Sequence, residues 1–299
     1  MAQDVNGPAS TAAVQARAES FLAVGRSHDA VEVLLAAGAP HLGPARLAFL
    51  LAQAHLGEDQ PDLARGAAEL GLGRAPESEW GLRLRAVALS RLGRHGAAID
   101  SALAATHSRP DLAATHVTLG SVCLSAHQAR SAVVPAETAL ALAPNDPDVH
   151  VLAGRVALAR RRTGVARRHF IDALALDPEH AVARNNVGIT DLRRFRAGQA
   201  KDHFVGSARL DPRGPGADNV AIVAKARRGY LVLVGMFAIV LVSSIQDHDL
   251  IGLPVIVAAI IAWRTDLLGR IYDRVRPPQP PKPTGLGTGG PWANGGTSG

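Results

Sequence analysis

Proline recurs at a fixed interval along most of the chain. Pro76, Pro110, Pro144, Pro178 and Pro212 are each 34 residues apart. Because proline lacks a backbone N–H and cannot continue a helix, this series predicts helix ends at a constant spacing. A period of 34 residues sets repeat starts at residues 11, 45, 79, 113, 147 and 181, and none of these units needs an insertion.

Small residues fall at three fixed positions of this repeat. Position 8 holds Ala18, Ala52, Ala86, Gly120, Gly154 and Gly188; position 20 holds Ala30, Ala64, Ala98, Ala132, Ala166 and Ala200; position 27 holds Ala37, Gly71, Ala105, Ala139, Ala173 and Ser207. Two packed helices lie roughly 8–10 Å apart, and small side chains allow the closest approach. The pattern therefore predicts a pair of antiparallel helices in each unit, which we name helix A and helix B.

A 34-residue period with small residues at these positions and proline at position 32 resembles the tetratricopeptide-repeat family. The resemblance covers about residues 11–214. It departs from the family in the first unit, where Leu42 replaces the proline, and at position 4, where no bulky aromatic occurs. It implies an all-α superhelix of about six helix-turn-helix repeats, in which helix A lines a concave groove and helix B forms the convex back.

The composition restricts the remaining possibilities. Aromatic residues make up 4% of the chain, too few for the bulky faces of a β-sandwich or barrel. Cys123 is the single cysteine, so neither an internal disulfide nor a thiolate metal cluster can form. The N-terminal residues lack the basic start and apolar core of a secretion signal, so most of the chain is expected on the cytoplasmic side.

The composition changes after residue 214. Residues 215–229 are expected to form a capping helix, and residues 230–263 contain two apolar stretches separated by the polar segment 246–249. Arginines flank these stretches on both sides, and the connecting loop has no lysine or arginine. This pattern predicts a transmembrane hairpin in the cell membrane with the repeats and both termini in the cytoplasm. A re-entrant hairpin and a buried core hairpin are the alternatives.

Three further segments complete the predicted organisation. Residues 264–276 alternate apolar and charged side chains at helical spacing, which suits an amphipathic helix lying on the headgroups. Residues 1–10 and the Pro- and Gly-rich residues 277–299 are expected to be disordered.

No catalytic motif occurs in the chain: there is no phosphate-binding loop, nucleophile elbow or zinc-protease helix. The sequence therefore predicts a protein that is not an enzyme and needs no cofactor. His116 and His150 share position 4 of adjacent repeats, and His169 and His203 share position 23. A metal between such pairs is conceivable, but carboxylate or thiolate ligands at matching spacing are missing, and no metal site is predicted.

The concave face is the candidate functional site. Positions 2, 5, 9 and 12 of helix A point into the groove in the family that the chain resembles. The residues predicted to bind a partner are Phe49, Gln53, Trp80, Arg83, Val87, Val117, Ser121, Val151, Arg155, Asn185 and Ile189. Their mixture of apolar side chains and isolated arginines fits a peptide or helix with an apolar face and an acidic group. The alternative is that they pack or solvate the interior of the superhelix.

Arginines gather in the turns between helices A and B. Arg91 and several others lie in these turns, and the set nearest the hydrophobic segment is Arg160, Arg161, Arg162, Arg193, Arg194 and Arg196. This basic edge could contact anionic lipid or simply be a solvated surface. Nucleic acid is disfavoured as a partner because no aromatic residues interleave with the arginines to stack bases.

These features lead to two functional hypotheses. In the first, the chain is a membrane-anchored scaffold whose cytoplasmic repeats bind a partner protein or peptide in the groove. In the alternative, it is a structural subunit of a membrane-embedded envelope-assembly or secretion complex, and the hairpin makes the main contacts.

Overall fold

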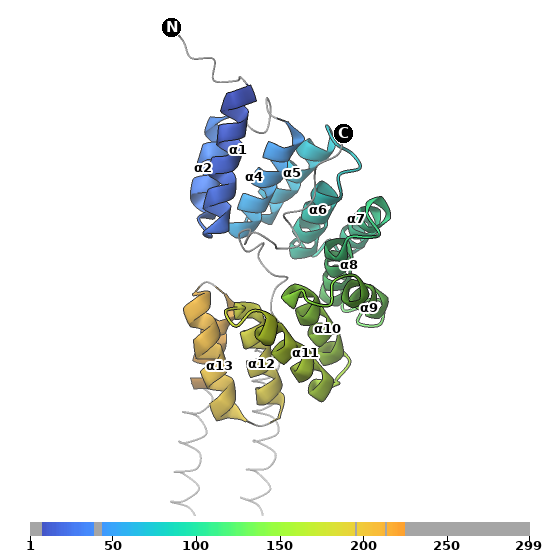
Figure 1. The fold of residues 1–299 in the computed structure, drawn as a ribbon, viewed down its shortest axis with the longest axis vertical. Coiled ribbons are helices and arrows are strands. Elements are labelled where there is room, and N and C mark those ends of the chain that lie inside the picture. Colours follow the sequence, from blue (N-terminus) through green and yellow to red (C-terminus); the bar gives the residue numbers. More distant parts are fainter. Residues whose placement is uncertain (1–7, 39–43, 195, 213, 225–299) are drawn as a thin grey trace, which may run out of the picture. The chain divides into compact units, whose positions relative to one another are not determined.

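The computed structural model describes residues 8–38, 44–194, 196–212 and 214–224. The regular structure of these residues is helical throughout (Figure 1). They divide into an N-terminal unit that ends at His169 and a C-terminal unit that begins at Phe170, and each unit is described by itself.

The N-terminal unit is a series of helix pairs. Its helices are α1 (Pro8–Ala23), α2 (Ser27–Ala36), α4 (Ala45–Gly57), α5 (Pro61–Leu72), α6 (Glu79–Arg91), α7 (His95–Ser108), α8 (Ala113–Ser125), α9 (Val133–Leu142), α10 (Pro147–Ala159) and the first half of α11 (Thr163–Leu176). Helices α4, α6, α8 and α10 begin at residues 45, 79, 113 and 147, which are the repeat starts read from the prolines. The all-helical repeat fold is thereby confirmed, whereas α1 begins three residues before the start read for its unit, residue 11.

Every described turn between helix A and helix B has the same backbone. Position 15 adopts a left-handed conformation at Gly25, Asp59, Gly93, His127 and Arg161. The following amide donates a hydrogen bond of 2.8–2.9 Å to the carbonyl five residues earlier, as in Arg26 to Phe21 and Gln128 to Cys123. This is the Schellman termination, which normally favours glycine. The repeat thus imposes the left-handed turn even where the residue has a side chain.

Helix α9 starts later than its counterparts. Helices α2, α5 and α7 begin at position 17 of their repeats, but α9 begins at Val133, four residues after the equivalent site. Pro135 explains the difference, because its ring opposes the carbonyl four residues earlier and would disrupt a helical first turn. Ala132 nevertheless remains fully buried at position 20, so the missing turn leaves the register of the repeat unchanged.

The small residues form the contact between paired helices. The six alanines at position 20 are all 0% exposed. The glycines at position 8 make room for larger side chains. A Cβ at Gly188 would lie 2.6 Å from Phe204 on its paired helix, whereas one at Gly120 would lie 2.9 Å from Leu152 on helix A of the next repeat. Close packing of this kind leaves no space for an added methylene group. Gly188 therefore packs as predicted, while Gly120 contributes to the contact between successive repeats.

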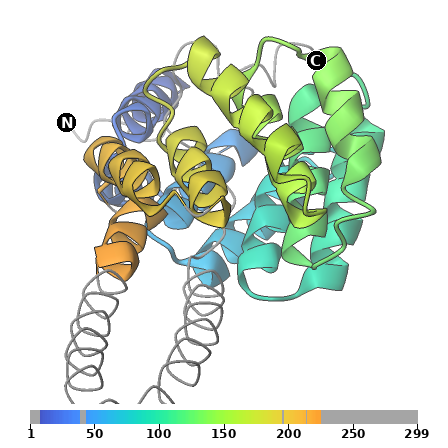
Figure 2. The same cartoon turned by 90° about the horizontal axis from the view of Figure 1, so that it is seen from below.

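The C-terminal unit contains the rest of α11, then α12 (Ala181–Arg193) and α13 (Ala197–Leu210), which run side by side in Figure 2. Residues 215–224 form a further helix. Within it, Asn219 donates a 2.8 Å hydrogen bond to Asn185, which lies 34 residues earlier at the same repeat position. Residues 215–224 therefore occupy the place of helix A in a following repeat.

Several predicted segments lie outside the described residues. These are residues 1–7, the end of the capping helix from residue 225, the hairpin 230–263, the amphipathic segment 264–276 and the tail 277–299. Among the described helices, none combines the length and the apolar character that crossing a membrane requires.

Candidate functional site

The predicted partner-binding residues share positions 2, 5 and 9 of the A helices, and we call the side chains at these positions the helix-A row. In the N-terminal unit this row is carried by α4, α6, α8 and α10, and in the C-terminal unit by α12. All of the predicted residues except Val87 are buried. Three of the apolar members, Val117, Val151 and Ile189, are no more than 4% exposed. The row is therefore largely interior, as in the alternative interpretation of these residues.

Phe49 belongs to the core of the N-terminal unit. Its ring fills the space left by Gly71 of α5 and Gly81 of α6, where an added Cβ would overlap the ring. It also meets Trp80 in an edge-on contact, with ring centroids 5.5 Å apart. Burial of this kind stabilises the contact between successive repeats. The prediction that Phe49 faces a ligand is therefore wrong, because two glycines draw its ring into the inter-repeat contact.

Trp80 is held from two sides. Phe49 packs against its ring, and the guanidinium of Arg46 lies 5.3 Å from the ring centroid while also binding Glu19 at 2.9 Å. The indole Nε1 is buried and has no hydrogen-bond partner in the described part of the chain. The same holds for Nε2 of Gln53 on α4. Both atoms are donors, and a buried donor without an acceptor costs about 1–3 kcal/mol.

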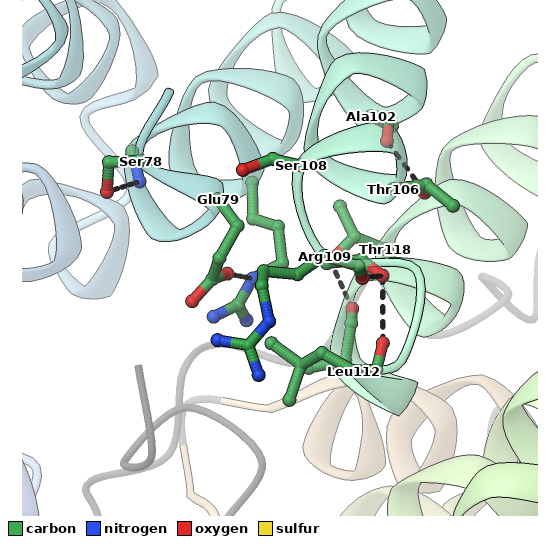
Figure 3. A network of polar contacts seen from close by, with 12 residues as sticks. Ser78, Glu79, Ala102, Thr106, Ser108, Arg109, Leu112 and Thr118 are labelled. Carbon is green, nitrogen blue, oxygen red and sulfur yellow. Dashed lines mark hydrogen bonds and ion pairs between the residues drawn. The ribbon is translucent and has the colours of Figure 1, made fainter. Parts of the chain in front are cut away.

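Arg83 forms an internal ion pair. Its Nε donates to Glu79, one helical turn earlier, at 2.5 Å, which is the dashed contact at Glu79 in Figure 3. Both side chains are buried. Burial lowers the pKa of Arg83, and the Glu79 carboxylate partly opposes that shift. The pKa of the exposed Arg109 is raised mainly by its hydrogen bond to Asp111, and the charge of Glu79 adds a smaller contribution in the same direction. Arg83 was predicted to face a ligand, but the structure pairs it within α6 because Glu79 lies one turn away.

Arg155 on α10 differs from Arg83. Its side chain is 9% exposed, and burial lowers its pKa to about 10 with no carboxylate opposing the shift. The described residues supply it with no ion pair. A charged group that is buried without a counter-charge is expensive, so Arg155 destabilises the chain as it stands.

The arginines of the turns separate into two groups. Arg160, Arg161 and Arg162 are exposed in the N-terminal unit. In the C-terminal unit Arg194 and Arg196 are exposed and Arg193 is half-buried. Arg91 is excluded from the exposed set, because its side chain is 5% exposed and donates a 2.6 Å hydrogen bond to the carbonyl of Leu56 in the preceding repeat.

The histidines at position 4 have a structural contact that recurs. A ring nitrogen of His116 lies 2.9 Å from the carbonyl of Pro110, and His150 makes the equivalent 2.8 Å contact with Pro144. The shared position of His116 and His150 suggested that their rings stack. In the structure the ring of His150 instead lies beside the ring of His169 in the same repeat, with centroids 5.8 Å apart. Cys123 is buried, and burial raises the pKa of its thiol, as expected for a core residue.

Comparison with known proteins identifies the architecture. No protein-family model and no curated protein matches the chain. Among solved structures, a thermophilic TPR protein of Thermus thermophilus matches with a TM-score of 0.54 and 16% identity over 56% of this chain and 92% of that chain. The Cut9–Hcn1 hetero-tetramer of the APC/C matches with a TM-score of 0.60 and 18% identity over 70% of this chain and 42% of that chain.

A third solved structure, pilF of Pseudomonas aeruginosa, matches with a TM-score of 0.50 and 20% identity, covering 68% of this chain and 92% of that chain. The chain has the tetratricopeptide-repeat fold. Identities at this level establish the fold of the repeats, and the helix-A row must be interpreted from its own residues.

Sequence reasoning found this row of the tetratricopeptide repeats but missed the state of its polar groups. The donors of Gln53 and Trp80 are buried without an acceptor among the described residues, and Arg155 is a buried cation whose lowered pKa no carboxylate opposes. The signal available in the sequence was the presence of polar residues at positions that hold Val117, Val151 and Ile189 in other repeats. Periodicity gives their position, whereas their burial depends on how neighbouring repeats pack.

Proposed function

We propose that the chain is a protein-interaction scaffold whose helix-A row binds a protein segment carrying a carboxylate and backbone acceptors beside apolar side chains. The role is one of binding, with no chemistry on the partner. The single observation that supports this most strongly is Arg155, a buried cation whose pKa is lowered by burial with no opposing anion.

The chemistry of the row selects the chemistry of the partner. Nε2 of Gln53 and Nε1 of Trp80 are donors without an acceptor among the described residues, and the guanidinium of Arg155 can only donate, so a partner satisfies these three groups only with acceptors. A carboxylate suits Arg155, since a charge-assisted bidentate contact is roughly twice as strong as a neutral one. The half-buried Val87 adds apolar surface to the row. A segment of main chain with acidic and apolar side chains provides all of these features.

The test is a peptide selection on the full chain in detergent. We expect the selected peptides to share an acidic residue next to apolar residues, and Arg155→Met to weaken their binding at least tenfold, a loss of about 1.4 kcal/mol. Arg160→Met is the matched control, because Arg160 is an exposed arginine at the end of the same helix. Peptides without acidic residues, or equal binding by the Arg155 and Arg160 variants, would contradict the proposal.

We also propose that residues 230–263 anchor the scaffold in the cell membrane as a hairpin, with the repeats and both termini in the cytoplasm. Two apolar stretches flanked by arginines support this proposal. The exposed Arg160, Arg161 and Arg162 would then add attraction to an anionic leaflet, about 1 kcal/mol for each residue near the surface. Release of the chain by carbonate without detergent would exclude an inserted hairpin, and retention in the membrane fraction is the expected result.

A further inference from the structure

A half-exposed ion pair occupies two positions of the helix-A row in the first two repeats. Glu19 stands at position 9 of the first repeat on α1, and Arg46 stands at position 2 of the second repeat on α4. Nε and Nη2 of Arg46 donate to the same carboxylate oxygen of Glu19, at 3.3 and 2.9 Å. The side chain of Arg46 is 36% exposed and that of Glu19 is 26% exposed. A partner in the groove can therefore reach this pair, unlike the buried pair of Arg83 and Glu79.

Arg46 is held in place independently of Glu19. Its guanidinium carbon lies 5.3 Å from the ring centroid of Trp80, and the edge-on contact with Phe49 supports that ring. A cation over the face of a tryptophan is attracted by the negative potential of the ring. Trp80 belongs to the third repeat and Glu19 to the first, so the aromatic contact remains when the carboxylate of Glu19 leaves. A guanidinium that is already oriented loses little freedom when it binds another carboxylate.

Glu19 binds Arg46 in the way that an external carboxylate would. It approaches the edge formed by Nε and Nη2, and two donors on one planar edge match carboxylate geometry. Its Oε1 also accepts a 3.0 Å hydrogen bond from Nε2 of Gln15, one helical turn earlier on α1. Ion pairs with this degree of exposure contribute little to stability, because water solvates both charges once they separate. Another carboxylate can therefore replace Glu19 at small cost.

We propose that Arg46 is a second carboxylate-binding subsite of the helix-A row and that Glu19 is an internal competitor, which the partner displaces. The inference rests on the proposed function, because the occupant is an acidic side chain of the same segment that binds Arg155. Arg46 lies in the second repeat and Arg155 in the fifth. The segment therefore carries two acidic residues at separate points along its length, and the acidic residue that meets Arg46 takes the place of Glu19.

The test is a binding titration of a selected acidic peptide with the full chain in detergent. Glu19→Gln weakens the competitor, and we expect it to bind the peptide about threefold more tightly than the wild type does. Glutamine keeps an acceptor for Nε2 of Gln15, and a gain in affinity cannot result from misfolding. Glu69→Gln is the matched control, because Glu69 forms a 2.9 Å surface ion pair with Arg65 on α5, outside the row. The control should bind as the wild type does.

The second arm removes the cation. Arg46→Met should weaken binding about fivefold, and Glu19→Gln should add no gain in the Arg46→Met background, because the two residues act on the same carboxylate. The control for the lost charge is Arg65→Met, which should leave binding unchanged. Equal affinities of Glu19→Gln and Glu69→Gln, or the same gain from Glu19→Gln with and without Arg46, would overturn the inference.

Arg155→Met separates this inference from the proposed function. If Arg155→Met weakens peptide binding while Glu19→Gln and Arg46→Met leave it unchanged, the proposed function stands and the second subsite is wrong. If the selection yields no acidic peptide, both are wrong. The result expected is a loss in Arg155→Met and in Arg46→Met, together with a gain in Glu19→Gln.

Discussion

The contact between paired helices and the helix-A row are both buried, but they are built on different rules. Position 20 is alanine in every repeat, and all six side chains are fully buried. Position 9 of the helix-A row changes in every repeat, from Gln53 to Val87, Ser121, Arg155 and Ile189. The first set is constant because two helices can approach closely only at small residues. The second varies because the spacing of the helices does not restrict it, so it can carry the specificity of the protein.

The two regions also differ in how their polar groups are satisfied. The paired-helix contact is apolar, and its turns close with main-chain hydrogen bonds of 2.8–2.9 Å. The helix-A row contains the buried Arg83, balanced by Glu79, and the buried Arg155, which no carboxylate balances. A stable scaffold therefore carries a locally unfavourable row. This is the arrangement expected where binding rather than folding satisfies the buried groups.

The largest expected effect comes from the balanced pair in the row. Glu79→Ala leaves the buried guanidinium of Arg83 without its anion and should lower the free energy of unfolding by about 3 kcal/mol. The double variant Glu79→Leu with Arg83→Met removes both charges and should recover most of that loss. Urea denaturation of the variants measures this. A double variant as unstable as Glu79→Ala would show that the pair does not act as a unit.

The next effect tests the paired-helix contact. Ala98→Leu adds volume at a fully buried site of α7 and should lower the free energy of unfolding by about 2 kcal/mol. The neighbouring Ala97 is exposed on the same helix, so Ala97→Leu is the control and should change stability by less than about 0.5 kcal/mol. Thermal and urea unfolding of both variants would distinguish them. Equal stability of the two would mean that position 20 does not face its partner helix.

Arg155→Met should change stability in the opposite direction. Removing a buried charge that lacks a counter-charge is expected to raise the free energy of unfolding by about 2 kcal/mol. The folded pKa of about 10 lies below the ordinary value of an arginine, so the unfolded chain holds this proton more tightly. The destabilisation by Arg155 is therefore constant well below pH 10 and declines as pH rises above 10.

The gain from Arg155→Met should accordingly be the same at pH 6 and pH 9, and urea unfolding at both values checks it. A loss of stability at either pH would contradict this account, because it would mean that Arg155 has a favourable partner within the chain.

The smallest effect concerns the turns. His127 and Arg161 adopt left-handed backbone angles, with φ of 59° and 61°. Replacing either by glycine relieves a penalty of roughly 1 kcal/mol and should yield a net stabilisation of about 0.5 kcal/mol after the entropy of glycine is counted. Gly93→Ala places a side chain at the equivalent site, where φ is 72°, and should destabilise by a similar amount. The unfolding midpoint should rise in the two glycine variants and fall in Gly93→Ala. A shift of the same sign in all three variants would contradict this account.

The sequence predicted the repeat because its signals are local and repeated. Proline at position 32 and small residues at positions 8, 20 and 27 determine where helices end and how closely they pack, and α4, α6, α8, α10 and α12 begin at the predicted residues. The delayed start of α9 follows from Pro135, which departs from the repeat pattern within helix B. The left-handed His127 and Arg161 could not be read in this way, because neither residue type indicates that backbone.

The candidate site was predicted less well, and the reason is tertiary. Phe49 was assigned to a ligand but lies against Gly71 and Gly81, which come from a neighbouring helix and from the next repeat. Arg83 and Arg155 are alike in sequence and differ because Glu79 stands one turn before the first. The contact of His150 with His169 joins two helices and has no signature at the 34-residue spacing. Side-chain contacts between elements decide such roles, and periodicity does not encode them.

The most direct test of the central claim is a double-mutant cycle between Arg155 and the acidic residue of a selected peptide. Binding is measured for wild type and Arg155→Met, each with the peptide and with its carboxylate-to-amide analogue. The account predicts that the amide analogue binds the wild type at least tenfold more weakly and that Arg155→Met does not discriminate between the two peptides. An equal loss in both proteins would show that the carboxylate does not meet Arg155 and would contradict the account.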